Sequence, residues 1–292
     1  MAAISFEKYQ GLGNDFILLD IYAQPALGLP TPEFIRGVCD RRFGVGADGV
    51  LLFSREADPN GVRMVYFNAD GSRAETCFNG LRCIARHAVR TGMMQTGQRF
   101  TIQSDAAPVE AVIRPDGSVK TGMPGPSFAP ADIPIAWSQE AIQQEFTFNG
   151  KRLTGTALSL GNPHFVIWER EKDSSGLNVI VTDLGAAVEK SPLFPRGTNF
   201  EAASLVGDHE VLMAVWERGV GVTMACGSGA AATVCAGVRA GFLSPDTPIT
   251  VKMAGGEILI QVEPEFRKIA VTGDAIHVFS GSLDMSNLSF LA

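Results

Sequence analysis

The sequence predicts an α+β fold of two similar domains, and three observations lead to this prediction. Strand-like runs greatly outnumber helix-like runs, and most links between them are too short for the crossovers that parallel strands require. The stretch 124–134, near the middle of the chain, holds four prolines and is the best linker. A short cysteine pattern occurs on either side of it, at 76–83 and 225–231. We therefore expect a duplicated chain in which each half has several strands and one central helix.

The first half contains signals for strands, turns and two helices. Glycines in 11–15 allow a sharp turn between the first two strands. Pro32 stands at the first position of a helix, a place that proline favours, and Gly92 is the expected C-cap of the helix after Cys77. We interpret 40–49 as a structural loop, because it lacks the context of a phosphate-binding loop. The expected elements are strands 5–10, 16–20, 50–53, 63–67, 100–103, 109–113 and 118–123, with helices 31–39 and 81–91.

The second half repeats this plan, with a helix that follows Cys226 and runs to Gly237. A hairpin is expected across the turn 207–209. The expected strands are 153–159, 164–168, 178–182, 201–206, 211–217, 247–252, 257–262, 268–272 and 277–280. We place the first domain at 1–123, completed by the C-terminal strand 277–292, and the second at 124–276.

Composition limits the classes of function. The chain has 292 residues, of which 46% are hydrophobic and 19% charged, as in an ordinary globular protein. Its net charge of −7 argues against a nucleic-acid partner, and no apolar run reaches the length of a membrane span. The five cysteines are an odd number without a CxxC pair, which argues against a disulfide scaffold and a zinc site. We expect a cytoplasmic protein with free thiols and no metal.

The two cysteine patterns carry the main chemical prediction. Cys77 and Cys226 each stand where a helix begins, and a helix start offers unpaired N–H groups and positive charge. Such a start binds a carboxylate and lowers a thiol pKa toward neutrality. Two starts facing one bound carboxylate would place a sulfur on either side of a carbon and move a proton between its faces. The alternative is that each cysteine is only a small hydrophobic residue buried in the core. The repetition of the pattern argues against this alternative.

Two further clusters contain residue types used in catalysis. Asn162 and His164 follow a glycine, and Glu217 with Arg218 stands nine residues before Cys226. A lone histidine or a single Glu–Arg pair is usually structural. Because each cluster lies at a strand end or in a glycine turn, together they favour a functional site.

Several motifs together resemble the diaminopimelate epimerase family, over nearly the whole length of the chain. The motifs are 11–16 (GLGNDF), 40–49 (DRRFGVGADG), 68–72 (NADGS), 161–164 (GNPH), 197–199 (GTN), 217–219 (ERG) and 225–230 (ACGSGA). The resemblance implies two similar, mostly antiparallel domains, each a β-barrel-like sheet around a central helix and related by a pseudo-two-fold axis. It also implies interconversion of LL- and meso-diaminopimelate in lysine and peptidoglycan synthesis, without a cofactor, and a homodimer as a candidate assembly.

The resemblance implies roles for individual residues. Cys77 and Cys226 become the acid/base pair, and His164 with Glu217 hold the α-ammonium group and tune the cysteines. The helix-start N–H groups near Phe78, Asn79, Gly227 and Ser228 bind the α-carboxylate. The distal amino-acid end is read by Asn14, Asn68, Asn162, Asn199 and Arg218.

The chain departs from the family pattern at three positions. Phe78 stands where family members usually have glycine, Val222 where many have glutamate, and Gly49 where some have glutamine. We expect strain at Phe78 if that position requires a backbone angle that only glycine adopts. A Phe78 ring that pointed inward would narrow the cleft.

Two other functions stay open at the sequence level. One is an isomerase of the same fold that racemises another amino acid, such as histidine, or shifts a double bond; Phe78 motivates it. The other is a non-catalytic binding or thiol-redox protein, against which the absent CxxC spacing argues.

Overall fold

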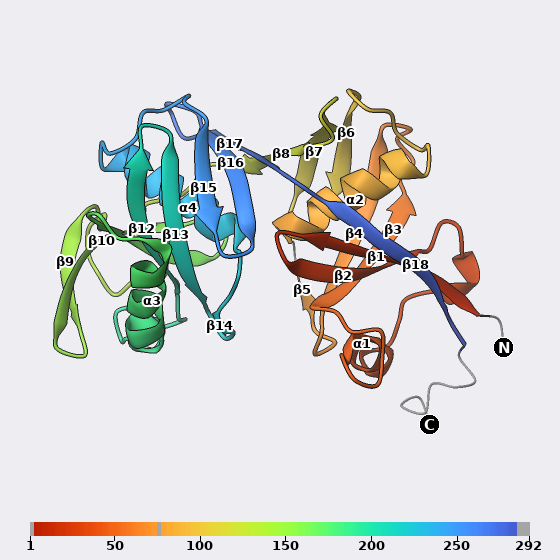
Figure 1. Cartoon of the computed structure of the whole chain (residues 1–292), viewed down its shortest axis with the longest axis horizontal. Helices are drawn as coiled ribbons and strands as arrows, with labels where there is room; N and C mark the ends of the chain where they lie inside the picture. Colours follow the sequence, from red (N-terminus) through yellow and green to blue (C-terminus); the bar gives the residue numbers. More distant parts are fainter. Residues whose placement is uncertain (1–2, 75–76, 285–292) are drawn as a thin grey trace. The chain divides into compact units, whose positions relative to one another are not determined.

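The computed structural model describes residues 3–74 and 77–284, and it divides the chain into two compact units (Figure 1). Unit 1 comprises Met1–Thr121 and Gly273–Ala292, and unit 2 comprises Gly122–Thr272. Each unit is mostly sheet with two helices of eight residues or more in its described part. Within the described residues, no helix combines the length and apolar character needed to cross a membrane.

Unit 1 takes one strand from the end of the chain. That strand, β18, pairs antiparallel with β1, the first strand of the sequence. The strands of unit 1 are β1 (Ile4–Gly11), β2 (Asn14–Asp20), β3 (Gly49–Arg55), β4 (Gly61–Asn68), β5 (Arg73–Ala74), β6 (Arg99–Gln103), β7 (Pro108–Ile113), β8 (Val119–Pro124) and β18 (Ile276–Leu283). Its helices are η1 (Pro25–Leu27), α1 (Pro32–Cys39) and α2 (Phe78–Arg90).

Unit 2 follows the same order of elements. Its strands are β9 (Gln144–Phe148), β10 (Lys151–Ser159), β11 (Pro163–Glu169), β12 (Asn199–Gly207), β13 (Glu210–Glu217), β14 (Gly221–Val222), β15 (Ile249–Met253), β16 (Gly256–Val262) and β17 (Lys268–Gly273). Its helices are α3 (Ser174–Glu189) and α4 (Gly227–Arg239).

Strand pairing shows that the two units are copies of one plan. In unit 1 the parallel pairs are β2–β3 and β4–β6, and α1 and α2 make the crossovers. In unit 2 the parallel pairs are β11–β12 and β13–β15, and α3 and α4 make the crossovers. The other pairs are antiparallel hairpins such as β1–β2 and β10–β11. The predicted class, α+β with two similar, mostly antiparallel domains, is confirmed.

The helices α1 and α2 of unit 1 pack on opposite faces of its sheet. Alternate strand residues point to opposite faces, so Phe16 and Leu51 join the core around α2, whereas Ile17 and Val50 join the core around α1. The α2 core buries Leu81 and its neighbours on the helix, which makes α2 the central helix of the unit. In unit 2, α4 runs against β10, β11, β12, β13 and β16, and its alanines allow close approach of the strands.

One predicted element of the second half is wrong. Residues 178–182 were expected to be a strand because they are rich in β-branched side chains, but they lie within helix α3. Asp173 caps this helix by accepting a hydrogen bond from the N–H of Gly176 at 2.8 Å. The helix buries Leu177, Val181, Leu184 and Val188, a spacing of three and four residues that outweighs the local β preference. Strand β9 was not anticipated.

Candidate active site

Both cysteines of the repeated pattern are N-caps, as predicted. The Sγ atom of Cys77 accepts a hydrogen bond from the N–H of Gly80 at 3.4 Å, at the start of α2. The Sγ atom of Cys226 accepts one from the N–H of Gly229 at 3.3 Å, at the start of α4. The first N–H groups of a helix have no partner inside it, so Phe78 and Asn79 in one unit, and their counterparts in the other, can donate to a carboxylate.

The unit 1 half-site joins three of the predicted residues. The side-chain oxygen of Asn14 lies 3.9 Å from the Cys77 sulfur and accepts from the Asn79 amide at 3.4 Å. The Asn14 amide donates to Asp48 at 2.7 Å, so its orientation is fixed. Asn68 ends β4, opposite Gly49 on β3, and its amide donates to the Ser72 hydroxyl.

The loop 40–49 supports this half-site, which agrees with its predicted structural role. Arg41 bridges Asp15 and Asp48, at 2.6 and 2.7 Å respectively. Lys8 forms an ion pair with Asp15 at 2.7 Å. Burial opposes ionisation of Asp15, but hydrogen bonds from Arg41 and Lys8 outweigh it and lower the pKa of Asp15 to about 2. The ionised network holds Asp48, and through it Asn14.

A buried cation that was not anticipated lies beside Cys77. Arg82 is fully buried on α2, and its guanidinium donates to the side chain of Asn79 at 2.6 Å. It also donates to the backbone carbonyls of Asp274 and Phe78. Burial lowers its pKa, whereas the neighbouring thiols Cys83 and Cys77 oppose that shift. Its position five residues after Cys77 is the signal that could have identified it.

The unit 2 half-site surrounds Cys226 with acidic groups. The Cys226 sulfur lies 3.4 Å from the Ser228 hydroxyl, and Glu217 accepts a short hydrogen bond from Thr223. Burial raises the pKa of Cys226 well above its usual value, and the charges of Glu217 and Glu201 raise it further. The prediction that the helix start lowers this pKa is therefore wrong for Cys226, because desolvation and two carboxyls exceed the effect of the helix dipole.

His164 is completely buried and is held by both ring nitrogens. Its Nδ1 atom lies 2.7 Å from Glu201 Oε1, and its Nε2 atom lies 3.1 Å from the side-chain oxygen of Asn162. Sequence reasoning missed Glu201, although it stands two residues after Asn199 on β12 and therefore on the same face of that strand.

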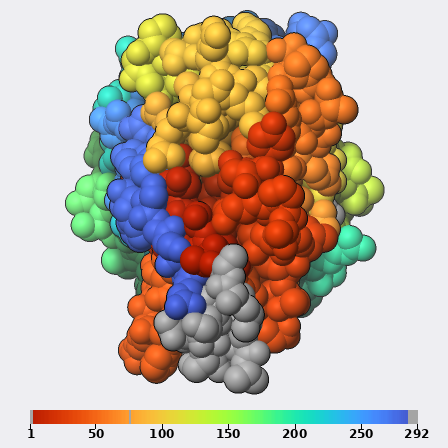
Figure 2. Space-filling model, turned by 90° about the vertical axis from the view of Figure 1, so that its right-hand side faces the viewer, coloured from red at the N-terminus to blue at the C-terminus, as the bar shows by residue number. Residues whose placement is uncertain are grey.

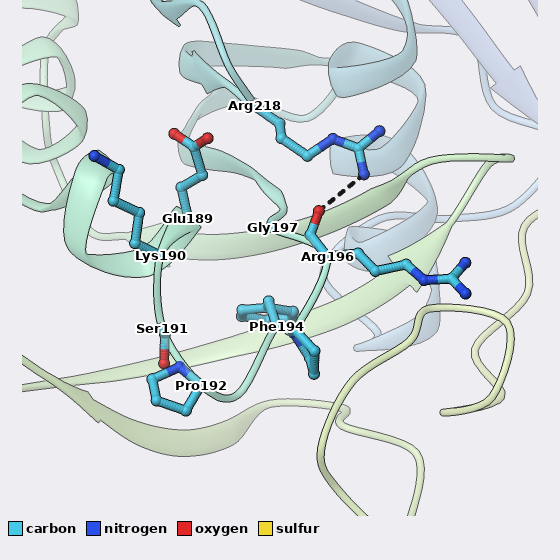
Figure 3. A pocket seen from close by; sticks show the side chains of 9 residues that line it. Glu189, Lys190, Ser191, Pro192, Phe194, Arg196, Gly197 and Arg218 are labelled. Atoms are coloured by element: carbon cyan, nitrogen blue, oxygen red, sulfur yellow. Dashed lines mark hydrogen bonds between the residues drawn. The ribbon is translucent and has the colours of Figure 1, made fainter.

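The structure joins Asn199 and Arg218 at one end of unit 2. The Asn199 side chain accepts from the backbone N–H of Arg218 at 2.8 Å. The Arg218 guanidinium reaches the Arg196 carbonyl at 3.2 Å, beside a hollow of about 380 Å³ (Figure 3). Glu189 lines the same hollow, but its carboxylate already accepts from Trp216 and from the N–H of Gly219. Apart from Arg218, the lining of this hollow includes none of the predicted site residues.

The three departures from the family pattern have visible structural settings. Phe78 is the first residue of α2, has a negative φ angle, and packs partly buried against the core around that helix. The strain considered for this position is absent. A side chain at Gly49 would meet the backbone of Phe67 at 2.4 Å and the Tyr66 ring at 2.6 Å, so glutamine does not fit there. Val222 is exposed.

No metal site was found in the described part of the chain, where no three His, Cys, Asp or Glu side chains form a suitable group. The five cysteines are free thiols. Each half-site instead offers backbone N–H groups, one sulfur and several amide or carboxyl groups, which suits binding of a zwitterionic amino acid and proton transfer at its α-carbon.

Two solved structures, among others, share this fold. A probable proline racemase from Agrobacterium radiobacter K84 aligns with a TM-score of 0.68 at 12% identity, over 97% of this chain and 93% of its own. A hydroxyproline epimerase from Agrobacterium vitis aligns with a TM-score of 0.67 at 13% identity, over 98% of this chain and 94% of its own. At such low identity the likeness establishes the fold alone.

Sequence comparison identifies the family of this chain. The diaminopimelate epimerase family model matches residues 6–128 and 156–278. The diaminopimelate epimerases of Synechococcus sp. (strain JA-3-3Ab) and Thermosynechococcus vestitus are each 39% identical to this chain. They cover 96% of it, and the matches span 98% and 99% of their own lengths. The chain belongs to the diaminopimelate epimerase family, as the motifs indicated.

Proposed function

We propose that this chain is a cofactor-independent isomerase that interconverts LL- and meso-diaminopimelate, the reaction that supplies lysine and peptidoglycan synthesis. The observation that carries the proposal is the matched pair of helix starts, each capped by a cysteine sulfur. Membership of a family whose relatives are named diaminopimelate epimerases supports the same reaction.

In the proposed reaction, one cysteine removes the α-proton as a thiolate and the other, as a thiol, protonates the opposite face of the carbon. An α-proton is only weakly acidic, so the carbanion requires donors that are already in place. The N–H groups of Phe78, Asn79, Gly227 and Ser228 supply them to the α-carboxylate. Glu217 holds the α-ammonium group, and His164, whose two ring nitrogens contact Glu201 and Asn162, adjusts the protonation of the cysteines.

The distal end of the substrate provides specificity. We assign its recognition to Asn14, Asn68, Asn162, Asn199 and Arg218. A site that hydrogen-bonds both ends of diaminopimelate rejects simpler amino acids, because they would leave buried polar groups without partners. The guanidinium of Arg218 is exposed, and its positive charge supports a contact with the distal carboxylate.

The proposal is tested by incubating the reduced protein with LL-diaminopimelate and separating the stereoisomers chromatographically. We expect meso product at a rate far above that for proline or histidine. Absence of meso product, with the protein folded and its thiols reduced, would overturn the proposal.

We extend the proposal to organisation and assembly. Each half-site belongs to one epimerase domain. The first domain is 1–123, completed by 277–292, and the second domain is 124–276. Strand β18 runs beside β1 on a face of unit 1 (Figure 2). Its exposed apolar side chains include Ile276, Val278 and Phe279. These apolar side chains support a homodimer, which light scattering would test. Free thiols fit the cytoplasm, where thiols stay reduced.

A further inference from the structure

Glu201 occupies a position whose counterpart in unit 1 is apolar. On the parallel pairs, Phe16 lies opposite Gly49 in unit 1 and His164 lies opposite Asn199 in unit 2. Two residues further along the second strand of each pair stand Leu51 and Glu201. The buried pair His164–Glu201 therefore takes the place that Phe16–Leu51 takes in the other copy.

Both residues at this position lie under the first turn of a central helix. A methyl group added to Gly80 would meet the Leu51 side chain at 2.8 Å, and one added to Gly229 would meet Glu201 Oε1 at 2.9 Å. Gly229 is also the residue whose N–H donates to the Cys226 sulfur. The Glu201 carboxyl thus lies directly beneath the cap that holds this cysteine.

A buried carboxyl at this place needs an explanation beyond packing. Glu201 is fully buried, and in the described part of the chain its Oε2 atom has no hydrogen-bond partner. Burying such a group without full pairing costs stability, and unit 1 demonstrates that an apolar residue fits the same position. Burial raises the pKa of Glu201, whereas the nearby His164 opposes the shift.

We propose that Glu201 is a positioning residue: it holds the His164 ring through Nδ1, directs Nε2 toward Asn162, and keeps Cys226 in its protonated, proton-donating form. At 2.7 Å the Nδ1 atom of His164 and the carboxyl of Glu201 can share one proton, and the histidine partner favours the ionised carboxyl that burial disfavours. The charged or titratable groups that face Cys226 within unit 2 are Glu217 and Glu201, with His164 behind Glu201. The assignment rests on the proposed function, since it names how one acid/base residue is prepared.

The direct test compares Glu201→Gln with Glu210→Gln in the full-length protein. Glu210→Gln is the matched control, because it removes one carboxylate from the adjacent strand β13, where Glu210 pairs with Lys252 on the surface. Two quantities are measured for each variant: kcat and KM with LL-diaminopimelate, and the reaction of each cysteine with methyl methanethiosulfonate across pH, resolved by mass spectrometry.

For Glu201→Gln we expect kcat to fall at least tenfold with KM within about threefold, since a carboxylate that orients an imidazole can contribute up to about 10⁴-fold to a rate. The reaction of Cys226 at neutral pH should become about fivefold faster, because loss of a neighbouring negative charge favours the thiolate. Cys77 and the control variant should not change. A Cys226 profile that superimposes on that of the parent protein would overturn the proposal, whatever happens to kcat.

A double variant covers the case in which Glu201→Gln does not fold. His164→Phe with Glu201→Leu copies the pair of unit 1, and we expect it to fold with a Tm no lower than the parent, because an apolar pair can replace a buried ion pair without loss. It should be inactive and show the faster Cys226 reaction; an unchanged Cys226 profile would overturn the proposal. The thiol measurement needs no substrate, so it remains decisive even if the parent protein fails to turn over diaminopimelate.

Discussion

Units 1 and 2 share their strand order and their cysteine-capped central helix, yet they place opposite charges near the two sulfurs. Unit 1 buries the Arg82 cation in the helix that begins after Cys77 and keeps the sheet beneath it apolar, with Phe16 and Leu51. Unit 2 has Ala231 at the position that matches Arg82 and puts His164 and Glu201 in the sheet. A duplicated fold has thus been adapted at a few buried positions, and these make the two half-sites chemically different.

The strongest test of the comparison removes each sulfur in turn. Cys77→Ala and Cys226→Ala should each lower kcat by about 10³-fold, because a positioned acid or base contributes roughly 10²–10⁴-fold. Matched controls exist within the same helices: Cys83 and Cys235 are buried thiols away from the helix start. Steady-state kinetics of Cys83→Ala and Cys235→Ala should stay within about threefold of the parent. Equal losses at all four positions would refute the special role of the two caps.

Arg82→Met tests the buried cation of unit 1. The substitution leaves three acceptors without the donor they have in the parent protein: the Asn79 side chain and the carbonyls of Phe78 and Asp274. It should lower the free energy of unfolding by about 2–4 kcal/mol. Arg86→Met is the control, since Arg86 also donates to backbone carbonyls but is only half-buried. Denaturant titration should give a smaller loss there, about 1 kcal/mol. An unchanged stability of Arg82→Met would contradict the role of the cation.

The features that the two units share could be predicted from the sequence, because they depend on local signals. Glycine turns, Pro32 and the repeated cysteine pattern indicated the helices and their caps, and the motifs indicated the family. Helix α3 was missed because the β-branched residues in 178–182 favour a strand locally, and the N-cap signal at Asp173 was given too little weight. Arg82 and Glu201 were missed because their burial, and the contacts with Asp274 and His164 far away in the chain, become apparent only in the folded protein.

Phe78→Gly gives α2 the same first residue as α4. It tests whether the two helix starts differ in function because of the Phe78 ring. The ring packs against the core of unit 1, so we expect a loss of about 1–2 kcal/mol in stability. The backbone N–H survives, and kcat/KM should stay within about threefold. A change of kcat/KM beyond tenfold, with the variant fully folded at the assay temperature, would show that the ring acts on the substrate.

A further prediction concerns the dependence of stability on pH, which differs between the two units. Asp15 of unit 1 has its pKa lowered to about 2 by Arg41 and Lys8. A lowered folded-state pKa contributes stability above the unfolded value near 4, and this stability is lost as the pH falls toward 2. Asp15→Asn should therefore cost about 1–2 kcal/mol at pH 7, after allowance for solvent screening.

Thermal unfolding between pH 7 and pH 2.5 checks this prediction. The difference between Asp15→Asn and the parent should shrink as the pH falls below 4. Asp183→Asn is a suitable control, because Asp183 is an exposed residue of α3 in unit 2. A difference that stayed constant with pH would mean that the ionised network around Asp15 does not stabilise unit 1.

The central claim is that two cysteines, one from each unit, exchange a proton with opposite faces of one carbon. Single-turnover incubation of LL-diaminopimelate in D₂O, with the thiols reduced, tests it most directly. We predict that the meso product carries one deuterium at the inverted α-carbon while the remaining LL substrate is still unlabelled. Meso product without deuterium, or label in the LL substrate before any meso product forms, would contradict a two-base mechanism.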